Sequence, residues 1–128
     1  MESVITFHGP VPRSNLHQYY DFADLCLVLG ISDGHHFEGH SLVFLEGNLR
    51  GIPAIGPIES GGEEAILDKV SGYCVDPHKP ADVAEKMRWV LEEHRIKPED
   101  CKKWAHDHSV ERQAECFEEI YEKVLANT

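Results

Sequence analysis

Basic residues are scarce in this sequence of 128 residues. Lysine and arginine number 12 against 23 aspartates and glutamates, which gives a formal net charge of -11. A chain this acidic lacks the positive surface that nucleic acids and anionic membranes attract, so we expect neither as a partner. Only Arg13 and Arg50 are basic in the first 68 residues. A phosphate bound in that region must therefore rely on backbone amides and helix dipoles.

Long apolar runs and closely paired cysteines are also missing. No apolar stretch is long enough to span a bilayer, and the first residues do not have the pattern of a signal peptide. The four cysteines, Cys26, Cys74, Cys101 and Cys116, show no C-x-x-C spacing. Cys26 and Cys74 fall in apolar, strand-like runs, which is typical of buried thiols in a reducing compartment. We therefore expect a cytoplasmic protein.

The distribution of apolar runs and turn residues predicts one α/β domain over residues 1–128. Short parallel strands are expected at about residues 4–7, 25–29, 53–56 and 72–75. Helices are expected from Ser14 or Asn15, Ser41, Glu63 and Pro80, with closing helices over about residues 98–126. This order predicts a partial doubly wound, Rossmann-like parallel sheet of about four strands with helices on both faces.

The segment FEGHSLVFLEGNLRG contains two carboxylates, Glu38 and Glu46. Leu42, Leu45 and Leu49 recur at the spacing of one helical face, and Glu46, one turn after Leu42, falls on that apolar stripe. A carboxylate that faces inwards costs several kcal/mol unless something hydrogen-bonds it. Taken alone, the two acids are best explained by a Glu46 that pairs with a neighbouring side chain and a solvated Glu38.

The residues around these acids resemble a known family. Glu38-Gly39, Leu42 to Glu46 and Gly51 to Ile55 are similar to the Glu-x7-Glu block of the group 1 (family four) glycosyltransferases. Those are retaining enzymes of the two-domain GT-B architecture. The similarity runs from about Val4 to Leu125 and corresponds to the later part of the family's C-terminal, donor-binding domain. The resemblance therefore implies a single truncated nucleotide-sugar-binding domain of the GT-B C-terminal type.

The resemblance also implies roles for individual residues. The seven residues between the two acids span roughly 12 Å along a helix axis, about the distance from the sugar to the ribose of a nucleotide-diphosphate sugar. By the family pattern Glu46 would hold the ribose hydroxyls, and Glu38 would contact the transferred sugar as the catalytic residue. Backbone amides at the helix start would contact the diphosphate. The implied donor-binding residues are Gly39, His40, Ser41, Leu42, Glu46, Gly61 and Gly62.

Two segments of the chain depart from the family pattern. His40 replaces a common Phe and Ser41 replaces a Gly, and both could touch donor hydroxyls or phosphate or remain solvated loop residues. Gly61-Gly62, which would add loop contacts to the donor, is followed by Glu63-Glu64 where the family usually has Pro-Glu, and this loop is one residue shorter.

Histidines and acids gather just before the expected helix. They could be drawn as a metal site formed by Asp33, His35, His36, Glu38 and His40. Nothing in their spacing places three of them on one side of a helix, and the family needs no protein-bound metal for its fold. We therefore expect no metal and no cofactor, only the nucleotide-diphosphate sugar as donor substrate.

Parts of the family pattern have no counterpart here. A complete enzyme has an N-terminal acceptor domain and two further β-α units, which supply an Arg and a Lys that clamp the donor diphosphate. Because electrostatic stabilisation of the leaving group is usually the largest catalytic term, we expect a glycosyltransferase by family whose chain alone does not turn over. One rival is a non-catalytic half-domain used for oligomer assembly. The other is a GT-B enzyme such as a sugar-nucleotide epimerase, which lacks the Glu-x7-Glu arrangement.

The expected topology leaves one edge of the sheet open. The strands at residues 4–7 and 25–29 would flank the missing central strands of the doubly wound order. Either residues 4–7 pair beside residues 25–29, or two copies associate across that edge. We expect a homodimer, since a four-residue strand covers the exposed edge poorly.

Overall fold

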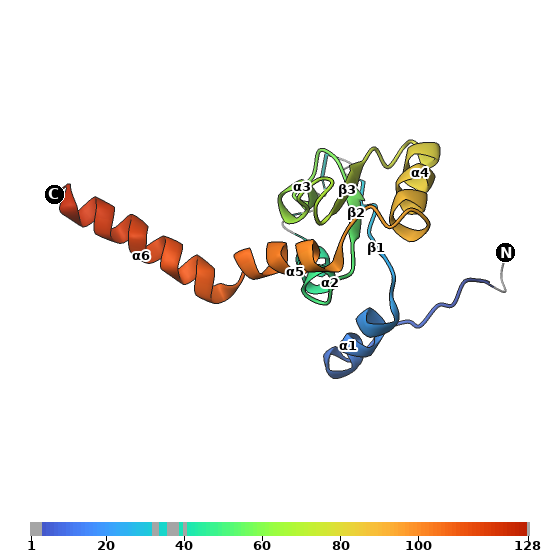
Figure 1. Ribbon diagram of the computed structural model, residues 1–128, viewed down its shortest axis with the longest axis horizontal. Helices are drawn as coiled ribbons and strands as arrows, with labels where there is room; N and C mark the ends of the chain where they lie inside the picture. The colour runs from blue at the N-terminus through green and yellow to red at the C-terminus, as the bar shows by residue number, and fades with distance from the viewer. Residues whose placement is uncertain (1–3, 32–33, 36–38, 40, 128) are drawn as a thin grey trace.

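A computed structural model describes residues 4–31, 34–35, 39 and 41–127 of the chain. Helices and strands follow one another in the order shown in Figure 1. They are α1 (Arg13–Phe22), β1 (Cys26–Leu27), α2 (Leu42–Leu49), β2 (Ala54–Pro57), α3 (Gly62–Ala65), β3 (Gly72–Val75), α4 (Pro80–Leu91), α5 (Pro98–Asp107) and α6 (Val110–Ala126). The predicted α/β class is confirmed.

The sheet is parallel, with its strands in the order β1-β2-β3. In the register of the sheet Cys26 lies beside Ala54, and Ala54 lies beside Gly72. A Cβ atom added at Gly72 would come within 2.0 Å of the carbonyl oxygen of Ala54. Glycine at this position is therefore required for β3 to pair closely with β2.

Helices cover both faces of the sheet, as the sequence predicts. On one face α4 contributes Val83 and Val90 to a cluster with Ile55 and Tyr73, and α5 contributes Cys101. On the other face Phe44 of α2 packs with Ala54 of β2, with Ala65 of α3 and with Ile66, which follows α3. The two clusters form a core on either side of the central strand, β2.

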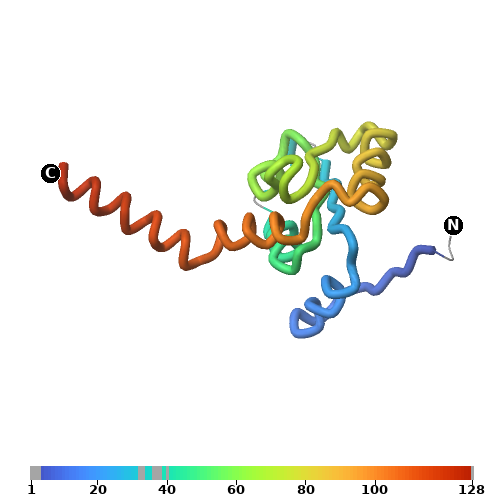
Figure 2. The backbone as a smooth tube through the Cα atoms, viewed as in Figure 1, coloured from blue at the N-terminus to red at the C-terminus, as the bar shows by residue number. Residues whose placement is uncertain are grey.

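The last two helices differ in how they meet this core. Helix α5 packs along α2, and the indole N–H of Trp104 donates a hydrogen bond of 2.9 Å to the carbonyl oxygen of Ala65. Helix α6 begins after Ser109, whose hydroxyl caps it by accepting a hydrogen bond of 3.2 Å from the backbone N–H of Arg112. From there α6 extends away from the sheet (Figures 1 and 2) and buries none of its residues.

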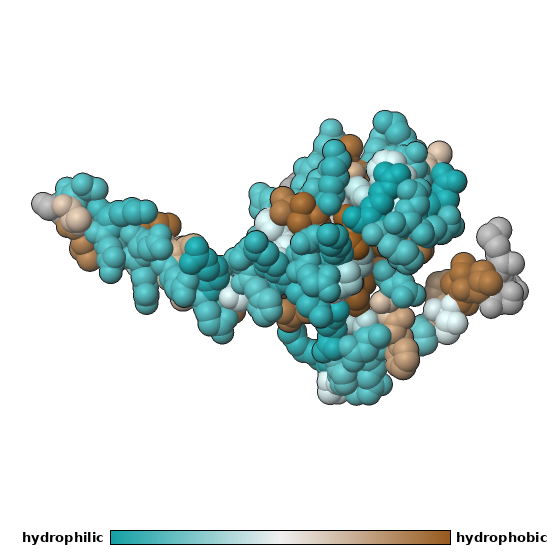
Figure 3. Space-filling model, viewed as in Figure 1, coloured by the Kyte–Doolittle hydropathy of each residue, from teal (hydrophilic) through white to brown (hydrophobic). Residues whose placement is uncertain are grey.

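The predicted strand at residues 4–7 is wrong. The structure shows no strand in this segment, and the side chains of Val4 and Phe7 are 80% and 92% exposed. Figure 3 shows the segment as a brown, apolar arm at the N-terminal end of the described chain. A β-rich sequence needs a neighbouring strand to satisfy its backbone groups, and no described strand pairs with these residues. The sheet therefore has three strands among the described residues.

Other boundaries moved by smaller amounts. The strand expected over residues 25–29 is confined to Cys26–Leu27, because only these residues pair with β2 in ladder register. Helix α1 starts at Arg13, and neither Ser14 nor Asn15 caps it. The strands near residues 53–56 and 72–75 and the helices from Ser41, Pro80 and Pro98 lie within two residues of their expected bounds. Within the described chain, no helix combines the length and the apolar character that crossing a bilayer requires.

Candidate functional site

Helix α2 begins at the edge of the sheet where the carboxyl ends of the strands lie, since it follows the loop that leaves β1. Ser41 is its N-cap residue and is buried, but its hydroxyl makes no capping hydrogen bond in the described structure. The first turn carries no acidic residue. The positive end of the helix dipole is therefore not offset by a carboxylate in that turn, which suits an anionic ligand.

Glu46 lies one turn further along α2 and faces α1. Its Oε2 atom accepts a hydrogen bond of 2.9 Å from the phenol O–H of Tyr20. Burial and then the contact with Glu46 raise the pKa of Tyr20 well above its ordinary value, so the phenol keeps the proton that it donates. Glu46 thus has a neighbouring side chain as partner, which the sequence left open as an alternative to ligand binding.

The face of α2 that meets the core differs from the predicted one. Leu42 and Leu49 are 62% and 50% exposed, whereas Phe44, Gly47 and Asn48 are buried. Gly47 fits because a Cβ atom added there would come within 3.3 Å of the Cβ of Cys26, so the helix backbone lies close to β1. The prediction that Glu46 shares a buried leucine stripe is therefore wrong, and Glu46 lies at the border between the core and the groove beside α1.

Two predicted site residues, Glu38 and His40, lie outside the described residues. Most residues of the metal site considered from the sequence also lie outside the described residues, namely Asp33, His36, Glu38 and His40. Gly39 is described and exposed, with open space where a side chain would be. The described part of the predicted site therefore comprises Gly39, Ser41, Leu42, Glu46, Gly61 and Gly62.

The glycine pair lies against α2. Gly61 is the N-cap residue of α3, and the N–H of Gly62 donates a hydrogen bond of 3.1 Å to Oγ of Ser60. A Cβ atom added at Gly62 would come within 3.2 Å of a ring carbon of Phe44 and 3.1 Å of Oγ of Ser60. The structure therefore places the Gly61-Gly62 loop against α2, and the amide of Gly62 already has a partner.

A crevice opens where the carboxyl ends of all three strands meet. Its volume is about 220 Å³, and it is lined by Gly30, Ile31, Ile58, Glu59, Ser60, Asp76, Pro77 and His78. Ligands of open α/β sheets bind outside the carboxyl ends of the strands. These residues were missed from the sequence, although each group lies in the loop that follows a strand, and that position was the signal that could have found them.

Two acidic residues line this crevice, Asp76 with two polar partners and Glu59 with a rare backbone conformation. Asp76 accepts a hydrogen bond of 3.0 Å from the backbone N–H of His78, and its second oxygen lies 3.1 Å from the ammonium of Lys79. The hydrogen bond and then the lysine hold the pKa of Asp76 below its usual value. Glu59 has a positive φ of 55°, a conformation that non-glycine residues adopt rarely and that is concentrated at functional sites.

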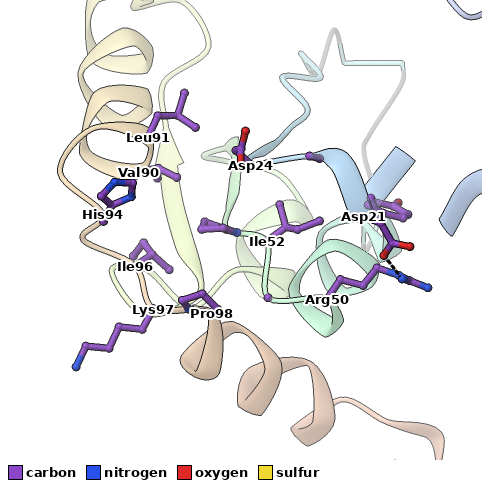
Figure 4. A pocket seen from close by; sticks show the side chains of 14 residues that line it. Asp21, Asp24, Arg50, Ile52, Val90, Leu91, His94, Ile96, Lys97 and Pro98 are labelled. Carbon is purple, nitrogen blue, oxygen red and sulfur yellow. Dashed lines mark hydrogen bonds and ion pairs between the residues drawn. The ribbon is translucent and has the colours of Figure 1, made fainter. Parts of the chain in front are cut away.

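A larger cavity, of about 900 Å³, lies at the opposite edge of the sheet. Figure 4 shows Ile52, Val90 and Ile96 around its centre and the ion pair between Asp21 and Arg50 at one side. Its residues precede β1 and β2 or join α4 to α5, so it lies at the amino ends of the strands. This is the edge where parallel α/β sheets do not place their ligands, and size alone does not make the cavity the candidate site.

Comparisons with known proteins agree with this geometry. A family model described as glycosyl transferases group 1 matches residues 1–108. The D-inositol 3-phosphate glycosyltransferase of Mycolicibacterium vanbaalenii is 36% identical over 91 residues, which are 71% of this chain and 19% of that protein. D-inositol 3-phosphate glycosyltransferase 2 of Catenulispora acidiphila is 31% identical over 94 residues, 73% of this chain and 21% of that protein. The chain thus spans about a fifth of the length of these curated relatives.

A solved structure has the same fold. Sucrose-phosphate synthase from Thermosynechococcus elongatus superposes with a TM-score of 0.72 at 20% identity. The match covers 96% of this chain and 31% of the synthase chain. The arrangement of a parallel sheet between helices therefore recurs in a larger protein.

Proposed function

The chain belongs to the glycosyl transferases of group 1, and from that membership we propose that it binds the nucleotide-diphosphate sugar of a retaining glycosyl transfer. The donor diphosphate lies at the N-terminal end of α2, and the ribose lies beside Glu46. Glu38, which precedes α2 in the sequence, contacts the transferred sugar. Fold likeness alone would not support a donor site, because one fold hosts many functions.

The observation that carries the proposal is the placement of α2. Its uncapped first turn begins at the carboxyl edge of the sheet, and its carboxylate Glu46 follows one turn later in a groove beside α1. The backbone amides at the helix start suit a diphosphate, and an ionised carboxylate accepts hydrogen bonds from two sugar hydroxyls. Gly39, His40, Ser41 and Leu42 contribute the helix-start contacts, and Gly61-Gly62 adds contacts from the start of α3.

Glycosyl transfer itself is proposed for the whole protein, since this chain spans about a fifth of its curated relatives. The chain alone does not turn over in this proposal. Its first 68 residues contain two basic side chains, and one of them, Arg50, already pairs with Asp21. A leaving diphosphate would lack the basic clamp that stabilises its charge. Titration with nucleoside diphosphates tests donor binding without requiring turnover.

A second candidate role is self-association across the open edge of the sheet. Strand β1 pairs with β2 on one side, and residues 4–7 do not cover its other side. Leu27 on this edge is 40% exposed. An uncovered edge strand pairs readily with a second copy, whose β1 would extend the sheet across a two-fold axis. A homodimer is the oligomer that this edge favours. The cytoplasmic location expected from the sequence also stays a prediction.

A further inference from the structure

Helix α1 makes two polar contacts with α2 and the residue that follows it. The phenol of Tyr20 donates to Glu46 at 2.9 Å, and Asp21 pairs with Arg50. Helix α1 buries none of its residues. The Tyr20–Glu46 hydrogen bond is partly buried, and it joins residues 26 positions apart in the sequence.

The groove around this hydrogen bond has room for a small polar group. Its volume is about 210 Å³, and its lining residues are Arg13, Leu16, His17, Tyr20, Glu46, Leu49 and Arg50. A carboxylate offers about four acceptor positions on its two oxygens. Tyr20 occupies one position on Oε2. The remaining positions suffice for the two neighbouring hydroxyls of a ribose.

A flexible glutamate loses conformational freedom when it binds a ligand, and this loss weakens binding. A hydrogen bond that already holds the carboxylate in place removes part of that cost before the ligand arrives. Tyr20 can supply this bond at every physiological pH, because burial and Glu46 raise the pKa of its phenol.

We propose that Tyr20 is a positioning residue, which orients the carboxylate of Glu46 toward the 2′- and 3′-hydroxyls of the donor ribose. The inference rests on the proposed donor site. It goes beyond that site because it assigns the selection of ribose over deoxyribose to a pair of residues, one from each helix. Loss of the phenol O–H should weaken the hold of Glu46 on the sugar without removing the carboxylate.

The test compares a nucleoside diphosphate with its 2′-deoxy counterpart. Calorimetric titrations use the tightest-binding of UDP, GDP and ADP, and then the matching deoxynucleotide, on the unaltered chain and on three variants: Tyr20→Phe, Glu46→Gln and the double variant. Tyr19→Phe is the matched control, because Tyr19 is on the same helix and its phenol lies 3.5 Å from His8 Nδ1 instead of near Glu46.

We expect the unaltered chain to prefer the ribonucleotide by at least about tenfold, the value of a hydrogen bond to a charged group. Tyr20→Phe should lower the ribonucleotide affinity by about three- to tenfold and reduce this preference. In the Glu46→Gln background Tyr20→Phe should have a smaller effect than in the unaltered chain, because the charge that the phenol positions is gone. Tyr19→Phe should behave like the unaltered chain. Melting temperatures report whether each variant folds.

Each contrary outcome has its own meaning. If the unaltered chain binds ribonucleotide and Tyr20→Phe keeps the full preference for ribose, Tyr20 is only structural and the inference is wrong while the donor site stands. The same holds if Tyr20→Phe weakens both nucleotides equally. If the folded chain binds no nucleoside diphosphate, the donor site itself is wrong, and this inference is overturned with it.

Discussion

The side-chain amide of Asn48 donates a hydrogen bond of 3.1 Å to the carbonyl oxygen of Ser71, which lies 23 residues later in the chain. The same amide donates a second hydrogen bond, of 2.9 Å, to the carbonyl oxygen of Ile52. Asn48 is fully buried, and its Oδ1 atom has no partner among the described residues. One polar side chain of α2 thus donates hydrogen bonds to a backbone carbonyl in the segment before β2 and to one in the segment before β3.

Replacement of Asn48 should therefore destabilise the fold. In Asn48→Ala the carbonyl oxygen of Ile52 loses the hydrogen bond from the amide, whereas that of Ser71 keeps a hydrogen bond of 3.1 Å from the backbone N–H of Ala54. We expect a loss of about 1–3 kcal/mol of unfolding free energy, mainly from the Ile52 carbonyl. Asn48→Asp should cost more, because a carboxylate of the same shape would face the two carbonyl oxygens without donating to them. Denaturant unfolding measures both, with the exposed Asn15→Ala as control. Equal stability of Asn48→Asp and the unaltered chain would contradict the hydrogen bonds described here.

This residue also shows what the sequence could predict of α2. The helix itself was predictable from its composition and from Ser41, but the buried face was not. Leucine periodicity pointed to Leu42 and Leu49, whereas the core takes Gly47 and Asn48. Close approach of the helix to β1 and hydrogen bonds to distant carbonyls select these two residues. Neither selection leaves a hydrophobic pattern in the sequence.

The strands divide in a similar way. Those near residues 53–56 and 72–75 were predictable, because continuous apolar runs bounded by Gly or Pro are typical of buried parallel strands. Residues 4–7 have a similar composition, but no strand among the described residues pairs with them, and pairing decides whether a strand forms. In the candidate site, the composition of the Gly61-Gly62 loop indicates only a turn, and the family resemblance is what selected it as part of a site. Tyr20 was missed because its contact with Glu46 spans 26 positions.

One of the four thiols should react rapidly with a thiol reagent, and the other three should be protected by burial. Cys116 is exposed, whereas Cys101 is buried and Cys26 and Cys74 are half-buried. At pH 8 we expect a thiol reagent to label one cysteine per folded chain rapidly and the other three slowly. Cys116→Ser should abolish the rapid phase. Rapid labelling of two or more cysteines in the folded chain would contradict the packing around β1 and β3.

The protected thiols also predict how stability depends on pH. Burial raises the pKa of Cys26, Cys74 and Cys101 from 9.0 to about 11. The folded chain therefore holds these protons more tightly than the unfolded chain does. Their contribution to stability is fully present below pH 9 and is lost as the pH rises toward 11. Chemical denaturation at pH 8 and pH 11 measures the loss, and a variant with all three replaced by Ala should lose less.

Self-association is predicted from the edge of β1 that faces away from β2, which no strand of the described chain covers. Light scattering across a concentration series should give the mass of a dimer at high micromolar concentration. Leu27→Lys places a charge on that edge and should shift the equilibrium toward monomer, because inward charges on edge strands oppose pairing. Lys69→Glu, at an exposed position outside this edge, serves as a control for altered charge. A monomer throughout the series would rule out the homodimer.

If Glu46 binds the donor, Glu46→Gln should change nucleotide affinity and thermal stability differently. Glu46→Gln keeps an oxygen that accepts the hydrogen bond from Tyr20 but loses the charge that attracts two sugar hydroxyls. We expect nucleoside diphosphate affinity to fall by about tenfold while the melting temperature changes little. A sharp drop in melting temperature with unchanged affinity would instead identify Glu46 as a structural partner of α1.

The most direct measurement is a titration of the folded, unaltered chain with UDP, GDP and ADP, in which calorimetry or ligand-observed NMR detects binding. The chain contains the start of α2 and Glu46 but not the basic clamp, so we expect weak binding of nucleoside diphosphates. At least one of the three nucleotides should bind with a dissociation constant in the millimolar range or lower. Glu46→Gln should weaken that binding. If none of the three binds at millimolar concentration while the chain is folded, the donor site proposed at α2 is contradicted.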